Sequence, residues 1–124
     1  MSKMIIAVLF TLITGATACQ SQQTKGGTAA AVINTISVDE FEKKIAAIPN
    51  AQLIDVRSAE EYNEGHLGNA KNIDINSDDF TTQLGSLDKT KPVLVYCLSG
   101  GRSGRAAGQM EELGFVEIYN MDGG

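Results

Sequence analysis

Basic and aromatic residues are scarce in this sequence, and the scarcity excludes several classes of protein. The 124 residues carry a net charge of −5 and 6% aromatic side chains, so we expect no nucleic-acid partner. No His, Cys or carboxylate residues show metal-ligand spacing, and no cofactor motif is present, so we expect neither a metal nor a cofactor. The length suits one modest domain and not two.

The N-terminal segment is typical of an export signal. Lys3 supplies a positive charge, and residues 4–13 form an apolar run too short to span a bilayer as a mature helix. Ala16 and Ala18 suit an ordinary signal peptidase, which would release a soluble protein. A cysteine directly after small residues, here Cys19, instead resembles the bacterial lipoprotein signal, in which that cysteine is lipidated. We favour the lipoprotein interpretation because Cys is uncommon at this position by chance, although the signal usually has Leu in place of Ala16.

These features predict a signal peptide over residues 1–18, a flexible tether over 19–31 and a folded domain over 32–124. The tether is polar and small, with no periodic apolar face. We expect an exported protein, either periplasmic or anchored to a membrane through a lipid on Cys19 and facing the periplasm. Cys97 is the only other cysteine, so it would stay a single thiol in an oxidising compartment. An unpaired thiol in such a compartment is a disadvantage to the protein unless it has a function.

Strand and helix patterns alternate along the domain. The predicted strands are separated by apolar residues at helical spacing, as in βαβ units with a parallel sheet and helices on both faces. Ser37 with Glu40 and Ser58 with Glu61 have capping-box spacing at two helix starts. The class is therefore α/β. The expected strands are 35–38, 53–56, 70–75, 93–96 and 116–119, and the expected helices begin near 38, 58, 80 and 102.

Cys97 lies at the end of the strand that is predicted to be the most buried, and a helix is predicted to follow Cys97. Ligands of open parallel sheets bind beyond the carboxyl ends of the strands. Gly100 and Gly101 let the backbone turn tightly, so that successive N–H groups point at one atom in front of a helix N-terminus. Arg102 adds a positive charge at the rim. A thiol placed there is expected to have a lowered pKa and to act as a nucleophile.

Motifs along the whole domain resemble the rhodanese-like sulfurtransferases. The resemblance covers about residues 35–124, and the motifs occur in the order that the family has them. It implies a small parallel sheet with helices on both faces. The motifs are the active-site loop 97–103 with Ala106 and Ala107 after it, the first signature in 53–57, 61–62, 65–67, 70 and 72–73, and the end of the domain in 114–115, 119–120 and 123–124.

The resemblance implies a mechanism. The Cys97 thiolate would take the outer sulfur of a donor such as thiosulfate and pass it from a persulfide to a thiophilic acceptor such as cyanide or a thiol. Backbone N–H groups of the loop would stabilise the persulfide anion. The loop from Cys97 to Arg102 has six residues, whereas related phosphatases of the same fold use one residue more, so phosphatase or arsenate-reductase activity is disfavoured. The expected substrate-binding residues are Leu98, Ser99, Gly100, Gly101, Arg102 and Ser103.

Three further polar residues need an interpretation. Asp55 and Arg57 lie at or just past the end of a neighbouring strand, and we expect them to support the site, Asp55 by holding loop backbone and Arg57 by pairing with an acid such as Glu61. His66 is the only histidine, but its position matches a fold signature in the resemblance, so we do not expect it to act as a general base.

Two alternatives to a small-molecule sulfurtransferase remain open. One is a persulfide carrier or sulfide-handling partner protein with little small-molecule turnover. The other is a binding module that kept the fold without the activity, which is disfavoured because such modules typically lose the cysteine. Rhodanese-like domains usually continue into a final helix that this sequence apparently lacks, since it stops at Gly124. The resemblance thus implies either a fragment or a sheet face that is open or covered by something else.

Overall fold

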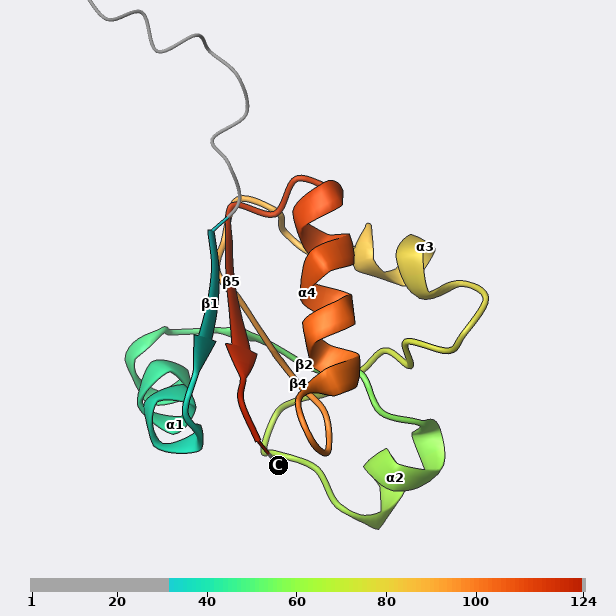
Figure 1. The fold of residues 1–124 in the computed structure, drawn as a ribbon, viewed down its shortest axis with the longest axis horizontal. Coiled ribbons are helices and arrows are strands. Elements are labelled where there is room, and N and C mark those ends of the chain that lie inside the picture. The colour runs from blue at the N-terminus through green and yellow to red at the C-terminus, as the bar shows by residue number, and fades with distance from the viewer. Residues whose placement is uncertain (1–31, 124) are drawn as a thin grey trace, which may run out of the picture.

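The computed structural model describes residues 32–123, so the predicted signal peptide, Cys19 and the tether lie outside the described residues. Five strands and four helices alternate along this part of the chain (Figure 1). The described residues contain no helix that is both long and apolar enough to cross a bilayer. The elements are β1 (Val32–Ile36), α1 (Val38–Ala47), β2 (Gln52–Asp55), α2 (Ala59–Glu64), β3 (Lys71–Asn72), α3 (Phe80–Leu84), β4 (Val93–Tyr96), α4 (Gly101–Glu112) and β5 (Glu117–Met121).

The strands form one parallel sheet in the order β1-β5-β4-β2-β3. Helix α1 lies on one side of the sheet, and α3 and α4 lie on the other (Figure 1). The predicted α/β class, with a parallel sheet and helices on both faces, is confirmed. All strands run the same way, so the loops after β2 and β4 emerge at the same edge of the sheet.

Strand β4 is buried on both faces and forms the centre of the core. Val93 and Val95 belong to the apolar cluster under α3 and α4, whereas Leu94 and Tyr96 belong to the cluster under α1. All four residues are at most 4% exposed. A strand covered on both sides has no polar face, which explains its uninterrupted apolar run. The next residue, Cys97, therefore begins its loop from a rigid base.

Several element boundaries differ from the sequence predictions because pairing and capping decide them. The first strand ends before Ser37, whose side chain accepts a hydrogen bond from the Glu40 backbone N–H and caps α1. The last strand continues to Met121 because Ile36 of β1 pairs beside it. The third strand is reduced to the two residues that pair with β2. The first boundary is set by a contact three residues away, whereas the other two are set by pairing with strands elsewhere in the sequence.

Candidate active site

The loop that follows β4 turns sharply into α4. Gly100 is the N-cap residue of α4 and has a φ of 92°, in the left-handed region that favours glycine. A Cβ built at Gly100 would meet its nearest atoms, the backbone N of Gly123 and the backbone O of Met121, at 3.5 Å, which is ordinary contact. The backbone angle, and not a lack of space, therefore requires glycine here. Its consequence is that the chain folds back over the Cys97 side chain.

The Cys97 thiol is buried and hydrogen bonded within this turn. The backbone N–H of Gly100 donates to Cys97 Sγ at 3.1 Å. Cys97 Sγ lies 3.4 Å from Ser103 Oγ, and the Ser103 hydroxyl lies 3.2 Å from the carbonyl oxygen of Gly100, to which it donates. With Cys97 ionised, the same hydroxyl is placed to donate to the sulfur instead. Cys97 is 3% exposed, less than the partial exposure expected of a nucleophile, yet it forms part of a pocket wall.

Opposing effects act on the ionisation of Cys97. Burial is the largest and raises the pKa of the thiol, because it disfavours the charged form. Hydrogen bonds from the Ser103 side chain and from the backbone of Ser103, Ser99 and Gly100 act the other way, and together they leave the pKa of Cys97 below its ordinary value. The geometry around Cys97 therefore favours a thiolate. Among residues 32–123, Cys97 is the free cysteine, with no disulfide partner.

The remaining predicted loop residues differ in their exposure and in their position relative to α4. Leu98 is 61% exposed and lines the pocket beside Cys97, and Ser99 is exposed next to it in the chain. Gly101 is the first residue of α4, and Ser103 is fully buried one turn into it. The backbone N–H of Gly100 hydrogen bonds to the Cys97 sulfur at 3.1 Å, and the backbone N–H groups of Ser103 and Ser99 also lower the pKa of Cys97.

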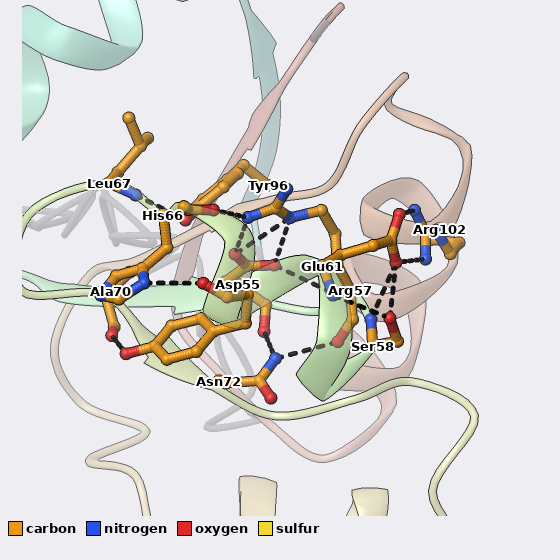
Figure 2. A network of polar contacts seen from close by, with 12 residues as sticks. Asp55, Arg57, Ser58, Glu61, His66, Leu67, Ala70, Asn72, Tyr96 and Arg102 are labelled. Atoms are coloured by element: carbon orange, nitrogen blue, oxygen red, sulfur yellow. Dashed lines mark hydrogen bonds and ion pairs between the residues drawn. The ribbon is translucent and has the colours of Figure 1, made fainter.

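Arg102 does not present a free positive charge at the rim, because it pairs with Glu61. Its two terminal nitrogens donate to the two Glu61 carboxylate oxygens at 2.7 and 2.9 Å (Figure 2). Glu61 also accepts from the backbone N–H and the hydroxyl of Ser58, completing the capping box predicted for α2. Arg102 first, and then the Ser58 backbone N–H, lower the pKa of Glu61 to about 2. This network ties the start of α2 to the start of α4.

Arg57 pairs with an acid, as expected, but that acid is Asp55, so Glu61 as the named partner of Arg57 is wrong. Arg57 donates to both oxygens of Asp55, at 2.6 to 3.0 Å, and to the carbonyl oxygen of Gly65 at 2.7 Å (Figure 2). The Arg57 backbone N–H also bonds Asp55 at 2.9 Å, so this carboxylate holds loop backbone as expected. Asp55 is fully buried only two residues away, and Glu61 is already occupied by Arg102.

Beside the Cys97 thiol lies a pocket, which the sequence did not predict. It has a volume of about 330 Å³ and is lined by residues from five separate parts of the fold. His66 is in its wall, with its ring stacked on Tyr62 at 3.7 Å and its Nδ1 2.9 Å from the Tyr62 carbonyl oxygen. No local pattern could have revealed the pocket, because its walls meet only in the folded chain. The lining residues are Val38, Phe41, Glu42, Arg57, Gly65, His66, Leu67, Tyr96, Cys97, Leu98 and Met121.

The fold and the site define an α/β protein with a cysteine held between a buried parallel strand and a helix N-terminus. The family model described as Rhodanese-like domain matches residues 37–124, and the chain belongs to this rhodanese-like family.

Relatives and solved structures agree with this assignment. Uncharacterized protein YqhL of Bacillus subtilis is 38% identical over 93 residues, covering 75% of this chain and 70% of that protein. Thiosulfate sulfurtransferase GlpE of Shewanella oneidensis is 33% identical over 89 residues, covering 72% and 85%. The crystal structure of a rhodanese-like domain protein from Staphylococcus aureus has a TM-score of 0.65 at 31% identity, covering 73% and 86%. Sulfurtransferase activity is thus represented in the family.

Proposed function

We propose that this protein is a sulfurtransferase that carries a sulfane sulfur on Cys97. The observation that carries the proposal is the hydrogen bonding of Cys97 Sγ by the Gly100 N–H and Ser103, which favours the thiolate. The similarity to Thiosulfate sulfurtransferase GlpE supports the same chemistry.

In the first step, the Cys97 thiolate attacks the outer sulfur of a donor such as thiosulfate. A new S–S bond forms to Cys97, the S–S bond of thiosulfate breaks, and sulfite leaves with the electron pair. The product is the Cys97 persulfide anion, so charge and atoms balance. The Gly100 N–H and the α4 N-terminus would stabilise the terminal sulfur, as an oxyanion hole stabilises oxygen.

In the second step, a thiophilic acceptor such as cyanide or a thiol attacks the outer sulfur of the persulfide. The S–S bond breaks, and Cys97 leaves as the thiolate that began the cycle. A low thiol pKa assists both steps, because Cys97 serves first as nucleophile and then as leaving group. Leu98, Ser99, Gly100, Gly101, Arg102 and Ser103 would surround the transferred sulfur.

A persulfide carrier is the second candidate function. Both guanidinium groups near Cys97 are already paired, Arg57 with Asp55 and Arg102 with Glu61. Capture of a small dianion such as thiosulfate would then be slow, and another protein would supply the sulfur.

Two measurements on the full chain and on Cys97→Ser test these functions. The sulfurtransferase proposal expects thiosulfate-to-cyanide transfer by the wild type and none by the variant. The carrier function expects little turnover but a mass increase of one sulfur atom after exposure to a donor, absent in Cys97→Ser. Wild type and variant that are equally inactive, with no added sulfur in either, would exclude both.

We also propose that the protein is exported and anchored through a lipid on Cys19. The sequence of residues 1–19 supports this proposal. Detergent partitioning of cell extracts tests it: the wild type should enter the detergent phase, and Cys19→Ala should stay in the aqueous phase. A wild type found entirely in the aqueous phase would exclude the anchor.

A further inference from the structure

The pocket beside Cys97 has apolar walls. They are supplied by α1 (Val38, Phe41), by the loop after α2 (Leu67), by the end of β4 and its loop (Tyr96, Leu98) and by the end of β5 (Met121). The volume of about 330 Å³ is in the range of small-molecule sites. Leu98 and Val38 are 61% and 36% exposed at the pocket, so a ligand that covers them gains from burying apolar surface.

The charges at this pocket do not suit a small anion. Arg57 is the cation in the wall, and its guanidinium is occupied by the buried Asp55. Glu42 is the acid in the wall, and within residues 32–123 no ion pair or hydrogen bond engages its carboxylate. A second cation, Arg102 of the active-site loop, is held by Glu61. A neutral or positively charged ligand is therefore favoured over an anionic one.

We propose that the sulfur acceptor is a small organic thiol whose apolar group occupies this pocket. The inference rests on the proposed function and narrows its acceptor class. The acceptor thiol loses its proton to solvent, and its thiolate attacks the outer sulfur of the Cys97 persulfide. A new S–S bond forms to the acceptor, the S–S bond to Cys97 breaks, and Cys97 leaves as thiolate. The products are the organic persulfide and the original enzyme, so no oxidant or reductant is needed.

Two thiols of similar acidity but different apolar length provide the test. The full chain is loaded with sulfur from thiosulfate or inorganic polysulfide, and removal of that sulfur by 1-propanethiol and 1-hexanethiol is followed by intact mass. Each methylene that is fully buried favours binding by about fourfold, so partial burial of the longer chain predicts a rate ratio of about tenfold or more. As a control, a small persulfide free in solution is treated with the same two thiols. This control gives the hexanethiol-to-propanethiol rate ratio in the absence of a pocket.

A matched pair of variants locates the effect. Val38 is 36% exposed in the pocket wall, and Val116 is 39% exposed outside it. We expect Val38→Ser to lower the hexanethiol-to-propanethiol ratio about threefold, and Val116→Ser to leave it unchanged. Leu98→Ser changes an exposed loop residue in the same wall and provides a second test should Val38→Ser fold poorly.

The outcomes separate this inference from the proposed function. A loaded protein that reacts equally fast with both thiols, or whose ratio matches that of the free persulfide, would overturn the inference and leave the sulfurtransferase intact. A ratio that falls equally in Val38→Ser and Val116→Ser would also overturn it. A protein that takes up no sulfur on Cys97 from either donor would remove the proposed function itself.

Discussion

Removing the Ser103 hydroxyl should make Cys97 a weaker nucleophile. Ser103 is fully buried, and its oxygen lies 3.4 Å from the sulfur. A hydrogen bond to a charged group is worth about 1.5–3 kcal/mol, and the length of this one favours the lower end of that range. Ser103→Ala should therefore reduce the thiolate population about tenfold at any pH where the thiol form dominates.

Alkylation of Cys97 by iodoacetamide as a function of pH measures this population. In a Cys19→Ala background Cys97 is the sole thiol. The pKa of Cys97 is lowered in the folded protein, so the wild-type rate should rise with pH and level off below the pH at which an ordinary thiol does. The Ser103→Ala curve should lie at higher pH, with the same plateau.

Ser99→Ala is the matched control, since the Ser99 hydroxyl makes no hydrogen bond to the sulfur and the residue is exposed. Its alkylation curve should follow the wild type. A Ser103→Ala curve that coincides with the wild type would refute the reasoning, because the hydroxyl would then contribute nothing to the thiolate.

Three further predictions concern the framework of the site. Gly100→Ala should lower the stability measured by thermal unfolding by about 1–2 kcal/mol, because residue 100 has a left-handed φ. Gly108→Ala, inside α4, should raise the stability. Equal effects of the two substitutions would contradict the account. Arg57→Lys loses the bidentate pairing with the buried Asp55 carboxylate and should lower the free energy of unfolding by about 1–3 kcal/mol. Replacing the exposed Arg105 by Lys should leave it unchanged. Similar urea-unfolding midpoints for the two variants would argue against this role of Arg57. Glu61→Gln should unfold at a lower temperature near neutral pH. Because the pKa of Glu61 is lowered to about 2, its contribution is full above its ordinary pKa and is lost as the pH falls through about 2, so the gap between variant and wild type should close there; a gap independent of pH would contradict it.

Local features of the site were predictable from the sequence, whereas long-range contacts were not. The loop from Cys97 to Ser103 and the Ser58–Glu61 capping box are set by neighbours a few residues apart, so their residue types reveal them. The partner of Arg102 lies 41 residues away, and either arginine could have been matched to Glu61 on charge alone. Which arginine pairs with Glu61 depends on where β2 and β4 place the loops that follow them.

The pocket was hidden from the sequence for the same reason. Phe41 and Met121 read as ordinary core residues, and their meeting beside Cys97 depends on the position of β5 next to β1 in the sheet. The extension of β5 to Met121 likewise follows from pairing with Ile36, at the far end of the domain sequence. Periodicity predicts which face of an element is apolar, and the topology decides which faces meet.

The most direct test of the central claim is the site of sulfur attachment. The full chain is exposed to a sulfane-sulfur donor, digested without reductant, and each cysteine-containing peptide is weighed. The account predicts one added sulfur atom on the peptide that contains Cys97, and none there in Cys97→Ser. A Cys97 peptide of unchanged mass in the folded wild type would contradict it.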